Sequence, residues 1–298
     1  MTYSRIDLGK YIVLSIWFGC NNDCTICMLS DFKTALPPIS FDLYKKVLAD
    51  IRKDGRFENL ILSGAEVTTF DSLKKYVQYA AALECFRKIQ IQTNGRRLSD
   101  KGYARQLVDC GVNEFFISIH GLEAVHDSVT RRQGAFRETI AGLSNLADLG
   151  VNVIVNSVLT RLNLHDIPAL MMFLTGTNAS EIHLWNFYPM ERTDSRDMVV
   201  SLAEFRALLQ EVLPVVSASG KPLILKSFPE CLAAGPLVFF DSIYPETVLP
   251  DRFWRAFSAC GFGTCVYRET CSAWQCWGLS SAYIHKYGDE RKLLSPIT

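Results

Sequence analysis

The chain of 298 residues carries ten cysteines, and most of them fall into two clusters. Three lie close together near its start, Cys20, Cys24 and Cys27, and five lie in its last third. Cys85 and Cys110 stand alone in apolar helical stretches, where a buried and inert thiol is expected. Clustered cysteines at short spacing in polar loops indicate metal or redox chemistry.

The spacing Cys20-x3-Cys24-x2-Cys27 is suited to an iron–sulfur cluster. Such clusters are normally held by four thiolates, so three leave one iron open to another ligand. A zinc site is the alternative. Structural zinc takes four closed ligands, usually in paired spacing, and no histidine lies within or just beyond the triplet. The triplet therefore predicts an iron–sulfur cluster with an open coordination position.

Short apolar runs alternate with amphipathic helical patterns over the first 215 or so residues. The candidate strands are 11–17, 59–62, 89–92, 114–119, 152–158 and 181–187. The candidate helices are 41–54, 70–85, 100–110, 136–149, 167–174 and 202–216. Six strand–helix units in succession imply a parallel α/β sheet with right-handed crossovers. Periodicity alone leaves an open doubly wound sheet and a partial barrel as alternatives.

Polar, glycine-containing turns follow the predicted strands. The triplet follows the first strand, Ser63-Gly64-Ala65-Glu66 the second, Thr93-Asn94-Gly95 the third and His120-Gly121 the fourth. Sites in barrels and open parallel sheets lie at the carboxyl ends of the strands. The sequence therefore predicts a functional site at this edge.

The charge balance excludes some partners. Lys+Arg and Asp+Glu both number 31, so the net charge is zero and no bulk positive field attracts nucleic acid or an anionic membrane. The start of the chain lacks the pattern of an export signal, and no apolar run is long enough for a membrane helix. A cytoplasmic protein is expected.

The triplet after the first strand resembles that of the radical S-adenosylmethionine (radical SAM) enzymes, and the resemblance extends to about residue 215. The turn Ser63-Gly64-Ala65-Glu66 is similar to the family's Gly-Gly-Glu turn, from which Ser63 and Ala65 depart. The resemblance implies a partial (β/α)6 TIM-like barrel that binds a 4Fe–4S cluster at the triplet and SAM beside it. The residues that it assigns to SAM are Ser63, Gly64, Ala65, Glu66, Thr93, Asn94, Ser118, His120 and Asn156. Glu66 is the expected partner of the methionine amino group.

Other side chains near the predicted site are assigned by their surroundings. Trp17, Phe18, Trp185 and Tyr188 are expected either as apolar walls of the site or as plain core. His126 begins a predicted helix, which favours a capping or surface position.

The late cysteines resemble those of the SPASM or twitch extensions, which carry auxiliary iron–sulfur clusters. These cysteines are Cys231, Cys260, Cys265, Cys271 and Cys276. Five suit one four-thiolate 4Fe–4S cluster with one cysteine left over, and Cys260 or Cys271 is the expected extra one. A zinc knot is the alternative. We expect two domains, the barrel over 1–218 and a small cysteine-rich domain over 219–298.

The expected function is that of a radical SAM enzyme. Such an enzyme cleaves SAM reductively to a 5′-deoxyadenosyl radical, which abstracts hydrogen from a small metabolite or peptide and so leads to modification, oxidation or epimerisation. The expected electron donor is a flavodoxin or ferredoxin. The little chain before Cys20 has no room for a peptide-recognition domain, which favours a metabolite or a short leader. The alternative is a non-catalytic iron–sulfur or zinc protein that carries electrons.

Overall fold

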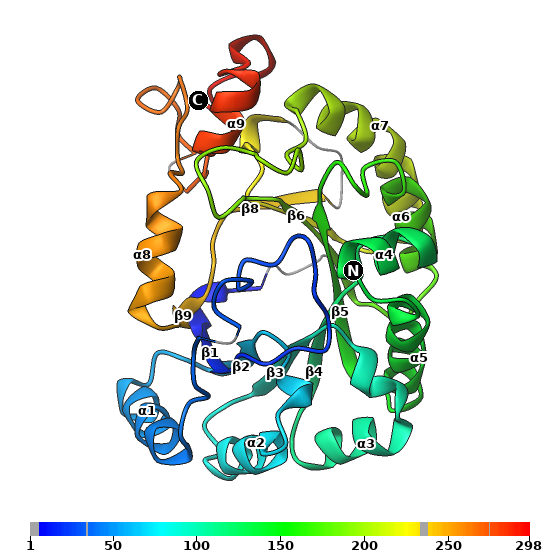
Figure 1. Ribbon diagram of the computed structural model, residues 1–298, viewed down its shortest axis with the longest axis vertical. Helices are drawn as coiled ribbons and strands as arrows, with labels where there is room; N and C mark the ends of the chain where they lie inside the picture. The colour runs from blue at the N-terminus through cyan, green and yellow to red at the C-terminus, as the bar shows by residue number, and fades with distance from the viewer. Residues whose placement is uncertain (1–5, 34, 233–237, 274) are drawn as a thin grey trace.

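The computed structural model describes residues 6–33, 35–232, 238–273 and 275–298. Its described residues form one parallel sheet in the strand order β8-β7-β6-β5-β4-β3-β2-β1-β9. The strands are β1 (Tyr11–Trp17), β2 (Asn59–Gly64), β3 (Lys88–Thr93), β4 (Glu114–Ser118), β5 (Asn152–Leu159), β6 (Glu181–Asn186), β7 (Leu223–Lys226), β8 (Val238–Asp241) and β9 (Glu246–Val248). Figure 1 looks along this ring of strands, with the loop that follows β1 drawn in blue inside it.

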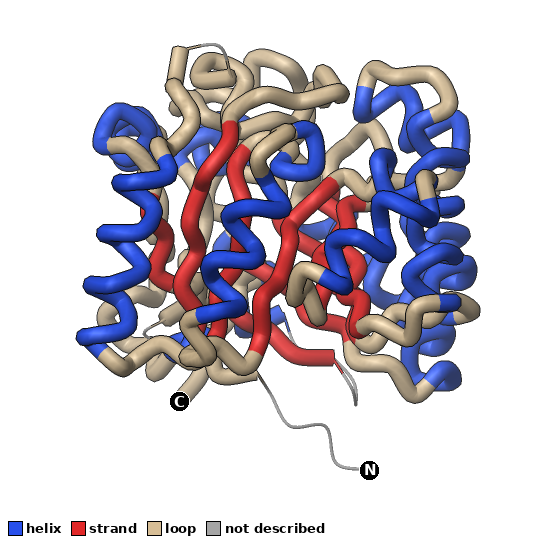
Figure 2. Tube along the Cα trace, turned by 90° about the horizontal axis from the view of Figure 1, so that it is seen from below, coloured by secondary structure: helices blue, strands red, loops and turns tan. Residues whose placement is uncertain are grey.

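Helices cover the outside of the sheet (Figure 1), and the view from below shows the strands running side by side among them (Figure 2). The α-helices are α1 (Phe41–Asp54), α2 (Leu73–Ala82), α3 (Lys101–Asp109), α4 (Glu123–Thr130), α5 (Ala135–Asp148), α6 (Ile167–Thr175), α7 (Leu202–Ser219), α8 (Asp251–Ala259) and α9 (Ser281–Tyr287). The 3-10 helices are η1 (Leu8–Lys10), η2 (Val67–Thr69), η3 (Arg96–Ser99), η4 (Glu230–Leu232) and η5 (Arg291–Leu293). None of the described helices is both long and apolar enough to cross a membrane.

Local sequence explains how the first strand and helix form. In β1, Ile12, Leu14 and Ile16 belong to the main core, whereas Tyr11 and Val13 belong to a separate small cluster. This alternation is the period of two of a strand with both faces buried. Helix α1 begins where the Ser40 side chain accepts the N–H of Leu43 and ends at Gly55, which has a left-handed conformation. These caps confirm the predicted helix 41–54.

The sheet is longer than the six strands expected. Within the described ranges, β7, β8 and β9 extend it, and all of them come from the part of the chain assigned to a second domain. They have four, four and three residues, so each is too short to show a clear period. The fold is the predicted parallel α/β barrel type with additional strands. The division after residue 218 stays a prediction.

The stretch from β8 to β9 bridges the two edges of the sheet. β8 pairs with β7 and β9 pairs with β1, both in parallel. Only residues 242–245 separate the two strands. An ion pair holds the start of this bridge, since Lys226 Nζ lies 2.6 Å from Asp241 Oδ2 and both side chains are buried. The bridge brings residues of the last third of the chain next to the barrel.

Candidate cluster and cofactor site

A cavity of about 240 Å³ lies at the carboxyl edge of the sheet, where the sequence predicts a site. It is lined by all three cysteines of the triplet. It is also lined by most of the residues assigned to SAM, namely Ser63, Gly64, Ala65, Thr93, Asn94, Ser118, His120 and Asn156. Residues of four neighbouring strands, β2 to β5, and of the turns after them thus share one cavity with the triplet.

The three thiols of the triplet interact with one another. Burial raises the pKa of Cys24 to about 12, and the neighbouring thiols of Cys27 and Cys20 add to the rise. Burial also raises the pKa of Cys20, and the backbone N–H of Asn22, 3.3 Å from the sulfur, opposes that rise. None of the three forms a disulfide. Burial thus disfavours the thiolate forms of Cys20 and Cys24, and a positively charged metal centre would favour them.

The donor set fits an iron–sulfur cluster better than a single metal ion. Among the described residues, no three His, Cys, Asp or Glu side chains converge closely enough to hold one ion. A 4Fe–4S cluster spreads its thiolates around four irons, and three free thiols that share a cavity supply such ligands. Asn156 is 5% exposed, and its Oδ1 accepts no hydrogen bond from any described residue. The cavity is therefore lined by a buried acceptor that a ligand can satisfy.

The carboxylate of Glu66 is directed to the turn after β3. It is fully buried and accepts hydrogen bonds from the Thr93 hydroxyl at 2.7 Å and the Asn94 N–H at 2.6 Å. The N–H and hydroxyl of Thr68 donate to it as well. Burial raises the pKa of this carboxyl, and the hydrogen bonds oppose that rise. Ser63, Gly64 and Ala65 line the cavity, whereas the structure places the Glu66 carboxylate behind it.

Arg96 ties the cysteine loop to the end of β3. Its guanidinium donates to the carbonyl of Asn21 at 2.6 Å and to Asn22 Oδ1 at 2.8 Å. Glu138 on α5 pairs with the same guanidinium at 2.5 Å. Lys33 donates to the Asn22 carbonyl from the far end of the loop. Sequence reasoning missed Arg96 because its partners lie 42 to 75 residues away in sequence, and Lys33 because its partner is a backbone carbonyl.

His120 presents a fixed hydrogen-bond donor to the cavity. Its Nδ1 accepts the backbone N–H of Val158 at 3.2 Å, so that nitrogen carries no proton. Burial lowers the pKa of His120 to about 3, which keeps the ring neutral with its proton on Nε2. His120 lines the cavity and is 5% exposed. The ring therefore offers an N–H to a ligand at neutral pH.

The expectation for His126 is wrong. This residue lies inside α4 and is completely buried rather than at a cap or on the surface. Its Nδ1 accepts the backbone N–H of His120 at 3.1 Å. Burial lowers the pKa of His126 to about 4. His126 thus supports the backbone from which His120 projects.

One of the four aromatic residues expected as walls lines the cavity. Trp185 does so beside Phe116, with ring centroids 5.8 Å apart. Trp17 stacks on Phe70 at 4.9 Å, away from the lining residues. Tyr188 lies near Trp277, at 5.7 Å, on the side of the late cysteines. Phe18 is buried without lining the cavity.

Four of the five late cysteines interact with one another. Burial raises the pKa of Cys231, and the thiols of Cys265 and Cys271 add to the rise. Burial likewise raises the pKa of Cys276, with a further contribution from Cys231. Cys260 is buried elsewhere, and its thiol donates to the carbonyl of Ala256 at 3.2 Å. This arrangement favours Cys260 as the surplus cysteine.

A parallel α/β barrel with a three-cysteine loop at its carboxyl edge defines a class of cluster-binding enzyme folds. The Radical SAM superfamily profile matches residues 14–174, more than half of the chain. The chain belongs to the radical SAM superfamily, whose members bind a 4Fe–4S cluster and SAM.

Curated relatives and a solved structure agree with this membership. An AdoMet-dependent heme synthase of Nitratidesulfovibrio vulgaris is 26% identical over 204 residues, 67% of this chain and 54% of the relative. A GTP 3',8-cyclase of Bradyrhizobium diazoefficiens is 29% identical over 230 residues, 72% of this chain and 64% of the relative. Streptococcus suis SuiB bound to precursor peptide SuiA shares the fold, with a TM-score of 0.60, 16% identity, and coverage of 78% of this chain and 49% of SuiB. The chain thus spans roughly half to two thirds of these proteins.

Proposed function

We propose that this protein is a radical SAM enzyme that abstracts hydrogen from a small metabolite or a peptide, leading to modification, oxidation or epimerisation. One observation carries the proposal: the free thiols of Cys20, Cys24 and Cys27 line the same cavity as the strand-end residues. The bound 4Fe–4S cluster supplies the electron that cleaves SAM to methionine and a 5′-deoxyadenosyl radical. The alternative of a non-catalytic carrier receives no support from the relatives, which bear the names of enzymes.

The chain's own residues divide into binding and positioning roles. The binding set is Ser63, Gly64, Ala65, Thr93, Asn94, Ser118, His120 and Asn156. In this assignment, the His120 Nε2–H donates to an acceptor of SAM or substrate, and the Asn156 Oδ1 accepts from a donor. Glu66 and Arg96 hold the turn and the loop in place through buried hydrogen bonds. Preorganised binding groups of this kind keep the reacting atoms close and exclude water.

We place the substrate on the side of the cavity formed by Trp185. Its ring lies 5.5 Å from that of Tyr244, which lies 4.9 Å from that of Trp277. These rings extend from the cavity toward Cys276, the neighbour of Trp277 in sequence. Relatives and structural neighbours include enzymes named for a haem, for GTP and for a precursor peptide, so both substrate classes stay within the proposal.

The second part of the proposal is an auxiliary 4Fe–4S cluster in the last third of the chain. Its proposed ligands are Cys231, Cys265, Cys271 and Cys276. The thiols of Cys265 and Cys271 add to the rise in the pKa of Cys231, and Cys231 adds to that of Cys276. Four thiolates close such a cluster and suit it to electron transfer or structure. We further propose a flavodoxin or ferredoxin as electron donor and the cytoplasm as the location.

The experiment that tests the site is spectroscopic. The chain is reconstituted anaerobically, reduced, and examined by electron paramagnetic resonance before and after addition of SAM. We expect SAM to change the signal of the triplet cluster in the wild type and in the control Cys110→Ala. In Cys24→Ala, the SAM-sensitive signal is expected to be lost. A reduced, iron-loaded wild type whose signal ignores SAM would contradict the proposal.

A further inference from the structure

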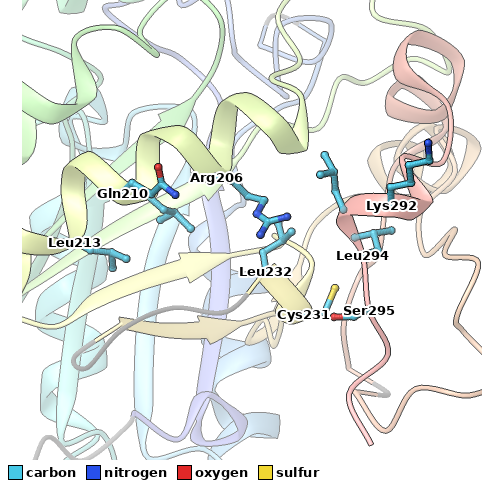
Figure 3. Close-up of a pocket in the computed structure, with 10 residues that line it drawn as sticks. Arg206, Gln210, Leu213, Cys231, Leu232, Lys292, Leu294 and Ser295 are labelled. Atoms are coloured by element: carbon cyan, nitrogen blue, oxygen red, sulfur yellow. The ribbon is translucent and has the colours of Figure 1, made fainter.

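The segment after η5 runs directly past the late cysteines. Leu294 anchors it, because this side chain is 6% exposed and belongs to the main core. The next residue, Ser295, lies beside the sulfur of Cys231 in Figure 3. Both residues line a cavity of about 300 Å³ between this segment and α7. Residues 295–298 therefore lie against the proposed auxiliary ligands.

A backbone N–H group of this segment donates to a cysteine sulfur. The N–H of Ile297 lies 3.3 Å from Cys271 Sγ. The preceding residue, Pro296, has no N–H. The Ile297 N–H thus binds one of the proposed ligands directly.

Ser272 holds the segment in this position. Its backbone N–H donates to the carbonyl of Ile297 at 2.7 Å, and its hydroxyl donates to the same carbonyl at 2.9 Å. Ser272 directly follows Cys271 in sequence. The two backbone polar groups of Ile297, its N–H and its carbonyl, therefore bind two consecutive residues, Cys271 and Ser272. This reciprocal pairing fixes the Ile297 N–H relative to the Cys271 sulfur.

An N–H aimed at a ligand sulfur has a definite electrostatic effect. Reduction of a cluster adds negative charge, which the positive end of an N–H dipole stabilises. Hydrogen bonds to the sulfurs and exposure to solvent are among the factors that set the reduction potential of iron–sulfur clusters. The N–H group of Ile297 therefore favours the reduced state of any cluster held by Cys271.

We propose that residues 295–298 form a clamp on the auxiliary cluster, in which the N–H group of Ile297 binds the sulfur of Cys271 and raises the reduction potential of the cluster. This inference rests on the proposed auxiliary cluster. It assigns a redox function to a backbone group, which side-chain replacement alone does not remove. Proline is the substitution that removes it.

The test uses the triple variant Cys20→Ala, Cys24→Ala and Cys27→Ala, in which only the auxiliary cluster remains. Ile297→Pro is compared with Ile297→Val by iron and sulfide content and by a redox titration followed by electron paramagnetic resonance. We expect the proline variant to favour the reduced state roughly tenfold less, a midpoint about 59 mV more negative for a one-electron couple. The valine control is expected to keep the parent potential.

The outcomes separate the clamp from the cluster. Loss of iron in the proline variant but not in its control also supports the clamp, provided that the same substitution in the chain with an intact triplet keeps the triplet's iron and hence the fold. Equal potentials and iron contents in the proline variant and its control would overturn the clamp while leaving the auxiliary cluster in place. A triple variant with no iron, whatever the residue at 297, would overturn the auxiliary cluster itself and the clamp with it.

Discussion

The carboxylate of Glu66 accepts the backbone N–H of Asn94 at 2.6 Å, so the turn after β2 holds the turn after β3. The same carboxylate accepts the hydroxyl of Thr93 at 2.7 Å. Both partners line the cavity, while the carboxylate itself is completely buried. The acidic residue of the motif thus holds two residues that line the cavity, and we propose that it acts on SAM through them.

Replacement of Glu66 distinguishes positioning from direct binding. In Glu66→Gln, an amide NH2 replaces one acceptor oxygen and leaves the Asn94 N–H without a partner. We expect the free energy of unfolding to fall by about 1–3 kcal/mol, measured by urea denaturation. Glu211→Gln, at an exposed position of α7, is the control and is expected to be neutral. Unchanged stability combined with lost SAM binding would instead make Glu66 a direct ligand of SAM.

The two buried histidines predict a loss of stability in mild acid. Burial lowers the pKa of His120 to about 3 and that of His126 to about 4, from 6.5. Both are neutral when folded and take up protons when unfolded. Their contribution is complete above about pH 6.5 and declines as the pH falls toward about 4, by about 1.4 kcal/mol per pH unit for each residue.

Denaturant titrations of the unreconstituted chain at pH 7, 6 and 5 measure this decline. His126→Asn keeps an acceptor for the backbone N–H of His120 and removes one titrating group. We therefore expect the dependence of the free energy of unfolding on pH to fall by about 1.4 kcal/mol per pH unit. A wild-type stability that is constant between pH 7 and 5, or a slope that the variant leaves unchanged, would contradict the neutral, buried state of these rings.

Arg96 predicts how firmly the triplet holds its cluster. In Arg96→Ala, the carbonyl of Asn21 and Oδ1 of Asn22 lose a charged donor. Such hydrogen bonds contribute about 1.5–3 kcal/mol, so we expect chelators to remove iron from the triplet roughly tenfold faster or more. Arg97→Ala, at the exposed neighbouring position, is the matched control. Equal rates of iron loss in both variants would show that the guanidinium does not hold the loop.

The ion pair between Lys226 and Asp241, at the start of the bridge from β8 to β9, predicts a large loss of stability in a single variant that a second substitution partly restores. Lys226→Met removes the ammonium that pairs with the buried carboxylate of Asp241, so we expect a loss of about 3–5 kcal/mol in urea denaturation. The double variant Lys226→Met/Asp241→Leu removes both charges and is expected to recover much of that loss. A double variant no more stable than Lys226→Met would mean that the pair is not the source of the effect.

Much of the barrel could be predicted from local patterns. The Ser40 cap and the spacing of apolar residues predict α1 correctly. The helix expected to begin at His126 begins instead at Glu123, and this start was missed because α4 is short and its N-cap residue, Leu122, forms no side-chain cap. Strands β8 and β9 were missed for a similar reason, since a strand of three or four residues shows no period of two in its apolar residues.

The site was predictable where it depends on strand ends and less so where it depends on contacts across the sequence. The strand-end rule found Ser63, Gly64, Ala65, Thr93, Asn94 and His120, and the family resemblance added Ser118 and Asn156. The same rule located Glu66 in the turn after β2 but not the direction of its carboxylate. That direction depends on donors such as the hydroxyl of Thr93, which lies 27 residues away in sequence. The hydrogen bond between Ile297 and Cys271 likewise joins residues 26 apart and has no pattern in the sequence.

Cleavage of SAM is the most direct test of the central claim that the triplet forms a radical SAM site. The chain is reconstituted anaerobically with iron and sulfide, and 5′-deoxyadenosine is measured by chromatography after addition of SAM and a strong reductant. We predict 5′-deoxyadenosine from the wild type and Cys110→Ala, and none above background from Cys24→Ala. Iron-loaded wild-type protein that yields no 5′-deoxyadenosine, or equal yields from Cys24→Ala and the wild type, would contradict the account.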